Sequence, residues 1–236
     1  MRGGLLMGLA ALAMMGGGAP TAAAPAKKPA AATHDWTKIV SATPEGGFRI
    51  GNPVAATRLI EYGSFTCSHC GHFARDGMPQ LLEQYVKSGK VSFEFRNFVR
   101  DPYDLTAAIL SRCAGPQEQF AMTESFFAAQ EQWVGRFTSM TDEQKKALST
   151  LPEAERPMRV AAIGGLDALA AKAGITPAKA RKCFADTAAT EKLVAMRAVA
   201  TEQYKLEGTP TFIINGKTTH AHDWAALKPL LGPPGN

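Results

Sequence analysis

Dense runs of Lys and Arg, long apolar segments and a second paired cluster of cysteines are all missing from this sequence. The 26 basic and 21 acidic residues are spread along the chain, and no basic run is interleaved with aromatic residues. Nucleic-acid binding is therefore not favoured. Hydrophobic residues make up 45% of the 236 positions, which is enough for one substantial core or for a domain with an inserted subdomain.

The apolar segment near the N-terminus is too short to be a permanent membrane anchor. It runs from Leu5 to Met15, which is about half the length of a spanning helix. Arg2 precedes it and small residues follow it, an order typical of a secretory signal peptide. We predict a signal peptide over 1–23, against the alternative of a low-complexity tail, and a flexible Ala/Pro/Lys linker over 24–35.

Only four cysteines are present, and none precedes Cys67. The absence of an earlier cysteine excludes a lipid-modified cysteine just after the signal peptide. An even number of cysteines in an exported protein suits an oxidising compartment. Two of them form a Cys-x-x-Cys pair, Cys67-Ser68-His69-Cys70, whereas Cys113 and Cys183 are solitary.

The segments on either side of this pair predict a strand, a helix and a second strand. The short apolar run over 56–65 is typical of a buried strand. Apolar residues at helical spacing follow the cysteines as far as Gly89. Residues 91–98 then alternate between apolar and polar, which indicates another strand. Two strands joined by a helix in this way form a right-handed crossover with parallel strands.

A long helical block follows, and then the strand pattern returns. Asp101-Pro102 with Asp104 is typical of a helix start, and Gly115-Pro116 of its end. Further helices are expected at 117–134, 141–149, 155–173 (interrupted at Gly164-Gly165), after Thr176-Pro177, and at 187–205. A strand over 211–215, a tight turn at Asn215-Gly216 and a helix over 223–231 complete the pattern. The sequence thus predicts an α/β fold with an inserted all-helical subdomain.

The Cys-x-x-Cys pair lies where a strand ends and a helix begins, and this position has chemical consequences. The backbone N–H groups and the positive dipole end of a helix N-terminus stabilise a thiolate at Cys67. His69 adds a donor or a positive charge beside it, so the Cys67 pKa is expected to fall below its usual value. Cys70, one turn later, is expected to be the more buried, resolving thiol.

Two structural interpretations compete with this redox one. Cys67, Cys70 and His72 supply three ligands of a zinc site, although no second paired cluster completes the usual four. A purely structural disulfide between Cys67 and Cys70 is the other alternative. It would join only neighbouring residues and would hold no distant segments together.

The segment Phe65-Thr66-Cys67-Ser68-His69-Cys70 resembles the active site of the DsbA-like branch of the thioredoxin superfamily. Downstream, Gly208-Thr209-Pro210-Thr211-Phe212 resembles its cis-proline loop. The resemblance implies a thioredoxin-like fold in two parts, 36–98 and 206–236, with the helical insertion at 99–205. It also implies that Cys67 is the nucleophile, that Cys70 resolves the mixed disulfide, and that Thr209 and Pro210 face the disulfide and the substrate.

Glu61 is a polar residue in an apolar strand, six positions before Cys67. One interpretation places it on the exposed face of an edge strand. The functional one makes it a buried carboxylate with a raised pKa, placed to exchange a proton with Cys70. We favour the functional interpretation. His72, His220 and His222 show no partner pattern and are interpreted as surface residues.

The two solitary cysteines are expected to pair with each other. Because the Cys-x-x-Cys is too local to need another partner, the pairing that remains joins Cys113 to Cys183. Both lie in the helical block, so the bond would hold the inserted helices together. The alternative is two separate buried thiols.

The expected function is that of an exported thiol:disulfide oxidoreductase that introduces disulfides into newly exported, unfolded polypeptides. The resemblance implies a periplasmic location and reoxidation by a quinone-linked membrane oxidase. We expect a monomer without cofactor or metal. A disulfide isomerase or reductase of the same fold is the alternative, although only about 30 residues lie between the expected cleavage point and the first strands, too few for a separate dimerisation domain. A metal-binding protein is the alternative from another class.

Overall fold

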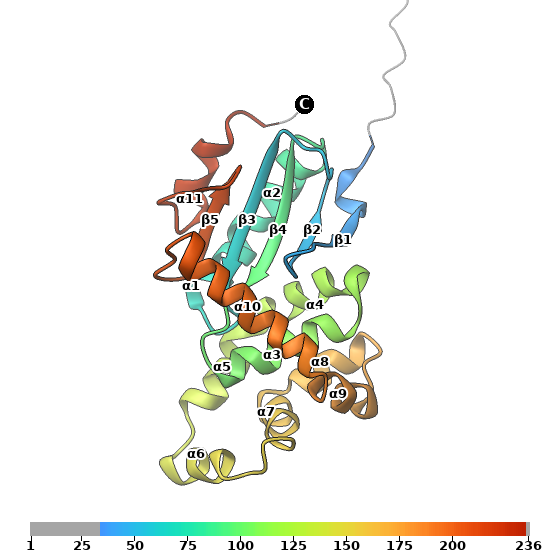
Figure 1. Ribbon diagram of the computed structural model, residues 1–236, viewed down its shortest axis with the longest axis vertical. Helices are drawn as coiled ribbons and strands as arrows, with labels where there is room; N and C mark the ends of the chain where they lie inside the picture. Colours follow the sequence, from blue (N-terminus) through green and yellow to red (C-terminus); the bar gives the residue numbers. More distant parts are fainter. Residues whose placement is uncertain (1–33, 235–236) are drawn as a thin grey trace, which may run out of the picture. The chain divides into compact units, whose positions relative to one another are not determined.

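The computed structural model describes residues 34–234, and the strands of this part form one six-stranded sheet (Figure 1). The expected signal peptide over 1–23 and the linker as far as residue 33 lie outside the described residues. The strands are β1 (Val40–Ala42), β2 (Phe48–Ile50), β3 (Thr57–Gly63), β4 (Val91–Asn97), β5 (Thr211–Ile214) and β6 (Lys217–Thr218). Their order across the sheet is β1-β2-β4-β3-β5-β6.

Strand β3 is central, with β4 on one side and β5 on the other. It pairs in parallel with β4, from Thr57 opposite Val91 to Gly63 opposite Asn97, which confirms the predicted crossover. It pairs antiparallel with β5, where Glu61 lies opposite Phe212. β5 then turns at Asn215 and Gly216 into β6. Strands β1 and β2 extend the sheet on the β4 side and were not predicted from the sequence.

The helices divide into the crossover, the insertion and the C-terminal end. The crossover contains α1 (Ser68–His72), the π-helical Phe73–Gly77, α2 (Met78–Leu81) and the π-helical Leu82–Val86. The insertion contains α3 (Pro102–Cys113), α4 (Pro116–Ala128), α5 (Gln130–Thr138), α6 (Asp142–Ser149), α7 (Arg156–Gly164), α8 (Leu166–Lys172), α9 (Pro177–Phe184) and α10 (Thr187–Gln203). The short 3₁₀ helix Trp36–Lys38 precedes β1, and α11 (Trp224–Leu227) with the 3₁₀ turn Lys228–Leu231 ends the described chain.

The insertion enters after β4 and returns to the sheet at β5, as the sequence predicts. Two of its expected helices are divided. The stretch over 117–134 breaks at Ala129, whose φ and ψ of −93° and 3° are not helical. The stretch over 155–173 breaks at Gly165, which takes the left-handed conformation at φ 73° that glycine adopts without strain. In Figure 1, α10 (orange) runs from the inserted helices across to the sheet.

The two faces of the sheet are covered differently. On one face, alternate residues such as Leu59, Phe93 and Phe95 pack with the crossover helix, α4 and α11 in the main core. On the other, Tyr62 and Ile213 form a small cluster with residues of α10 and the segment after it. Every residue of β4 is buried, so the polar face expected from its alternation is not solvent-exposed.

An ion pair explains how β4 tolerates this burial. The Arg96 guanidinium donates to Glu94, with 2.6 Å between Nε and Oε1, and to the Tyr62 hydroxyl at 3.2 Å. Thr43, in the loop between β1 and β2, also donates to Glu94 at 2.7 Å. Buried charges require this kind of pairing. The paired groups come from β4, from β3 and from the loop between β1 and β2.

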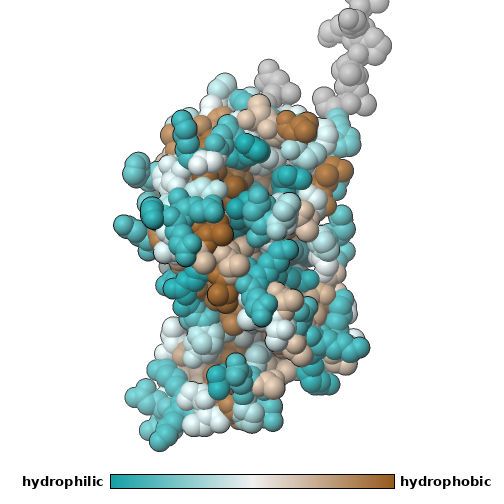
Figure 2. Space-filling model, viewed as in Figure 1, coloured by the Kyte–Doolittle hydropathy of each residue, from teal (hydrophilic) through white to brown (hydrophobic). Residues whose placement is uncertain are grey.

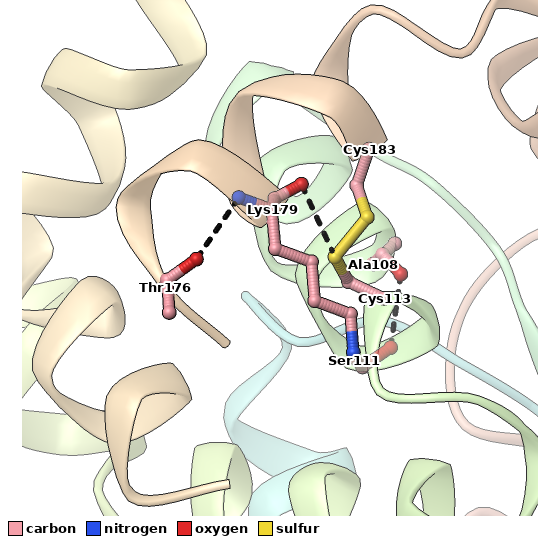
Figure 3. Close-up of a disulfide and its surroundings, with 6 residues drawn as sticks. All are labelled: Ala108, Ser111, Cys113, Thr176, Lys179 and Cys183. Carbon is pink, nitrogen blue, oxygen red and sulfur yellow. Dashed lines mark hydrogen bonds between the residues drawn. A yellow bond between two sulfur atoms is a disulfide. The ribbon is translucent and has the colours of Figure 1, made fainter. Parts of the chain in front are cut away.

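Cys113 is bonded to Cys183, the pairing expected from the sequence. The Cα atoms are 5.9 Å apart and the bond spans 70 residues of chain. Figure 3 shows the bond joining the end of α3 to α9, whose first turn is capped by the Thr176 hydroxyl. Cys113 Sγ also lies 3.8 Å from the carbonyl oxygen of Lys179. The bond thus attaches α9 to α3, the first helix of the insertion.

Most of the molecular face seen in Figure 2 is hydrophilic, and its apolar side chains occur in separate small groups. Four large apolar residues are exposed among those described, Ile39, Val54, Val194 and Leu230, each on a different segment. Between residues 34 and 234, no helix has the length and apolar character that crossing a membrane requires.

Candidate active site

Cys67 and Cys70 lie where β3 ends and the crossover helix begins. Cys67 is the N-cap of α1, in extended conformation, and its carbonyl oxygen accepts from Gly71 N at 3.1 Å. Both cysteines are free thiols in the structure. Cys67 is 4% exposed and Cys70 is completely buried, so the first cysteine is the one that a substrate can approach.

The two thiols have opposite pKa shifts. The pKa of Cys67 is lowered from 9.0 to about 5, chiefly by the hydrogen bond from the Cys70 thiol, then by Thr209 and by the backbone N–H groups of Cys70 and His69. These donors outweigh the burial that opposes them. Burial raises the pKa of Cys70 well above 9.0, with further contributions from Cys67 and Glu61. At neutral pH the pair therefore holds its negative charge on Cys67.

The loop at Thr209 and Pro210 faces this cysteine. The peptide bond between these residues is cis, and Cys67 Sγ lies 3.1 Å from the Thr209 carbonyl oxygen. The loop leads directly into β5, the antiparallel neighbour of β3. The two segments singled out in the sequence, 142 residues apart, thus meet at one point.

His69 contributes to the site through its backbone. Its N–H group is among the donors that lower the Cys67 pKa, whereas its side chain is exposed on α1. The imidazole lies edge-on to that of His72, with 6.2 Å between ring centroids. The tuning effect expected of the His69 side chain stays a prediction.

Glu61 lies on the central strand of the sheet and is 1% exposed. This position excludes the alternative of an exposed edge strand. Burial raises the pKa of the Glu61 carboxyl well above 4.5, and the charge of Cys67 raises it further. Glu61 in turn raises the Cys70 pKa. A carboxyl whose pKa is raised, and whose charge acts on a buried thiol, has the properties of a proton donor and acceptor.

A buried carboxylate at Asp104 holds the loop that precedes Cys67. Its Oδ1 accepts from Phe65 N at 2.8 Å, and its Oδ2 accepts from the Ser64 hydroxyl at 2.6 Å and from Arg100 N at 2.9 Å. Burial raises the pKa of Asp104 to about 7. The sequence pattern indicated only a helix-start residue here. Asp101 performs that capping role, and it also accepts from the Thr66 hydroxyl at 2.6 Å.

Gln130, at the start of α5, holds the same loop from the insertion side. Its Nε2 donates to the carbonyl oxygens of Phe65 and Cys67, each at 2.8 Å. The side chain lies directly against Gly71, where a Cβ atom would collide with Oε1 of Gln130. Sequence reasoning missed Gln130, since a lone Gln in a helix carries no signal of a partner 65 residues away.

His222 is exposed, as interpreted from the sequence, and it also contacts the cis-proline loop. Its Nδ1 lies 3.0 Å from the carbonyl oxygen of Pro210, and in the tautomer with hydrogen on Nδ1 the ring donates to that oxygen. The contact gives the Pro210 carbonyl oxygen, just before β5, a hydrogen-bond partner. The residue after His222, Asp223, is the N-cap of α11.

No group of three or more His, Cys, Asp or Glu side chains within the described residues is placed to hold a metal ion. Cys67 and Cys70 instead contact each other and the Thr209 loop, while His72 is exposed. The side chains gathered at the site, two thiols and a buried carboxyl, can exchange a disulfide and move a proton.

Asp104→Ala is expected to lower the free energy of unfolding by about 3 kcal/mol, because it leaves two buried donors and Arg100 N without their acceptor. Urea denaturation measures the loss. Asp104→Asn is the matched control, which keeps the volume and one acceptor oxygen and should cost less. If Asp104→Ala is as stable as the wild type, Asp104 does not hold the loop.

Comparisons with known proteins agree with this geometry. The thioredoxin family model matches residues 43–232. A solved structure described as a protein-disulfide isomerase from Novosphingobium aromaticivorans is 35% identical, with a TM-score of 0.73, over 78% of this chain and 94% of that one. The structure of Wolbachia pipientis alpha-DsbA1 is 24% identical, with a TM-score of 0.56, over 78% and 87%, and shows the same fold.

Curated relatives match as well. A Rickettsia bellii protein named "Putative protein-disulfide oxidoreductase" is 28% identical over 77% of this chain. The chain spans about three fifths of that relative's length, 62%. The family match covers strands β2 to β6, the inserted helices and both segments that form the site. The chain therefore belongs to the thioredoxin family, and it has a thioredoxin-like fold with an inserted helical subdomain.

Proposed function

We propose that the protein is an oxidase, which passes the Cys67–Cys70 disulfide to unfolded polypeptides. The observation that carries the proposal is the asymmetry of the two thiols, with a Cys67 pKa of about 5 and a Cys70 pKa well above 9.0. Stabilising a thiolate stabilises the reduced pair, and a stabilised reduced form makes the disulfide a stronger oxidant.

The exchange proceeds through a mixed disulfide at Cys67. A substrate thiolate attacks Cys67 Sγ, the bond to Cys70 breaks, and Cys70 leaves as a thiolate that needs a proton. Glu61 supplies that proton. A second substrate thiolate then attacks the substrate sulfur of the mixed disulfide, which releases Cys67 as a stabilised thiolate. The oxidised substrate dissociates from a reduced enzyme, and reoxidation closes the cycle.

The proposed setting is the periplasm, reached through the signal peptide expected over 1–23. The proposed substrates are newly exported polypeptides that contain cysteines, and the proposed oxidant of the reduced enzyme is a quinone-linked membrane oxidase. We propose a monomer. The disulfide between Cys113 and Cys183 supports an oxidising compartment, because such bonds persist outside the reducing cytosol.

A disulfide isomerase is the second candidate. It is favoured by the name of the Novosphingobium relative, at 35% identity. An isomerase must be partly reduced while it works, so its redox potential is lower than that of a dedicated oxidase.

The redox potential of the Cys67–Cys70 pair, equilibrated against glutathione, separates the candidates. We expect a value well above about −180 mV, in the range of oxidases, whereas a reductase has a value near about −270 mV. The Cys113→Ala, Cys183→Ala double variant is the control, because it removes the second disulfide from the measurement. A potential near or below that of an isomerase contradicts the oxidase proposal.

A further inference from the structure

A small cavity lies in the core between Glu61 and helix α4 of the insertion. Its volume is about 10 Å³, which is at the lower limit of what a single water molecule requires. Strands β2, β3 and β4, the crossover helix and α4 surround it. The lining residues are Phe48, Glu61, Ala74, Met78, Phe93, Phe95, Phe120, Thr123, Glu124 and Phe127.

Two polar atoms in the wall of this cavity lack a hydrogen-bond partner among the described residues. They are Oε1 of Glu61 and Oγ1 of Thr123. Both residues are deeply buried, with exposed fractions of 1% and 5%. Buried polar atoms are almost always paired with protein or with ordered water, so two such atoms on one small cavity indicate a shared water site.

Glu124 is the third polar residue of the wall. It follows Thr123 on α4, and its side chain reaches the exposed side of the helix. Burial of part of this side chain raises the pKa of Glu124 above 4.5. Glu61 and Glu124 are the titratable residues that line the cavity. The cavity therefore joins a fully buried carboxyl to a carboxyl that solvent can reach.

Glu61 needs a connection of this kind. Cys70 is completely buried and Glu61 is 1% exposed, so neither group can exchange a proton with bulk water directly. Every turnover nevertheless protonates Cys70 once and deprotonates it once. A carboxyl that cannot recover its proton would act in one turnover only.

We infer that a water molecule in this cavity, together with the Thr123 hydroxyl, relays protons between Glu61 and Glu124. The inference rests on the proposed function. When Cys70 leaves the disulfide, Glu61 gives it a proton and becomes a carboxylate. The cavity water then returns a proton to Glu61 and receives one from Glu124 through Thr123, and Glu124 is protonated by solvent. Only protons move along this path, and they move in reverse when the disulfide is formed again.

The experiment starts from the mixed disulfide between Cys67 and glutathione. Attack by Cys70 releases glutathione. In the proposed relay, Glu61 must first pass its own proton to Glu124, and only then can it accept the Cys70 proton. We expect Glu61→Gln to slow the release on the order of 100-fold, and Thr123→Val and Glu124→Gln to slow it about tenfold each. In the Glu61→Gln background, Thr123→Val and Glu124→Gln should not slow the release further, because the relay already lacks the carboxyl that exchanges its proton with Cys70.

Glu118→Gln is the matched control, since it removes the same charge from an exposed position on the same helix, away from the cavity. It should release glutathione at the wild-type rate. The alkylation rate of Cys67 should be the same as in the wild type in Thr123→Val, Glu124→Gln and Glu118→Gln, whereas a general structural defect would change it. Circular dichroism checks the fold of Thr123→Val. If Thr123→Val is misfolded, the release rate of Glu124→Gln alone tests the relay.

Two results would overturn the relay. The first is that Glu124→Gln releases glutathione at the wild-type rate although Glu61→Gln releases it slowly. The second is that Glu124→Gln slows the release by the same factor in the wild-type background and in the Glu61→Gln background. A wild-type protein that forms no mixed disulfide at Cys67 would instead refute the proposed function, so the two failures are distinguishable.

Discussion

Cys67→Ala is expected to abolish thiol–disulfide exchange, whereas Cys70→Ala should accumulate mixed disulfides with its substrates. The first variant lacks the nucleophile whose pKa is lowered to about 5. The second keeps that nucleophile but lacks the buried thiol that releases the substrate. Non-reducing electrophoresis and mass spectrometry detect the trapped species, and the double variant is the control that should trap nothing.

The pH dependence of alkylation tests the same assignment independently. Because the thiolate is the reactive form, labelling of the reduced protein at Cys67 should be half-maximal near pH 5 and should fall below that pH as Cys67 gains a proton. Cys70, whose pKa lies well above 9.0, should stay unlabelled across this range. Labelling of Cys70 before Cys67 at mildly acidic pH would show that the two roles are reversed.

Replacing both Cys113 and Cys183 with Ala is expected to lower the melting temperature by roughly 10 °C. The bond closes a loop of 70 residues, and in the chain-entropy model a loop of this length contributes about 4 kcal/mol by restricting the unfolded chain. Differential scanning calorimetry measures the shift. Exchange at Cys67 should be largely intact, because the bond joins α3 to α9 and touches none of the active-site residues.

Single replacements of the same two cysteines are the controls. Cys113→Ala and Cys183→Ala should each lose nearly as much stability as the double variant, since either one opens the loop. A melting temperature equal to that of the wild type would show that the bond does not restrain the unfolded chain. A loss of exchange in a folded double variant would instead connect the bond to the redox pair.

The sequence predicted those parts of the fold whose signals are local. The strand before Cys67, the parallel crossover to β4 and the return to strand at Thr211 each follow from a short apolar pattern with a recognisable start or stop. Strands β1 and β2 were missed because they contain three residues each, too few for a period to appear. Phe48 is nevertheless completely buried in β2.

The support of the site depends on contacts that local patterns do not contain. Asp104 has the spacing of a helix-start residue, yet its partners Ser64 and Phe65 are about 40 residues away in the chain. Gln130 follows the break at Ala129 in the helix expected over 117–134, and its amide donates to the carbonyl oxygen of Cys67. Glu94 and Arg96 looked like the exposed face of a strand, and their mutual charge pairing is what permits their burial.

The central position of β3 has a consequence for the order in which the molecule is completed as it is synthesised. Its first partner, β4, follows within a few tens of residues, but Arg58 bonds to Asn215 across 157 residues. A contact over this distance closes late, because the chain between its ends must first be ordered. The thiols at Cys67 and Cys70 therefore exist long before the strand that carries Thr209 and Pro210. An emerging chain therefore holds both thiols before the cis-proline loop that faces them has been synthesised.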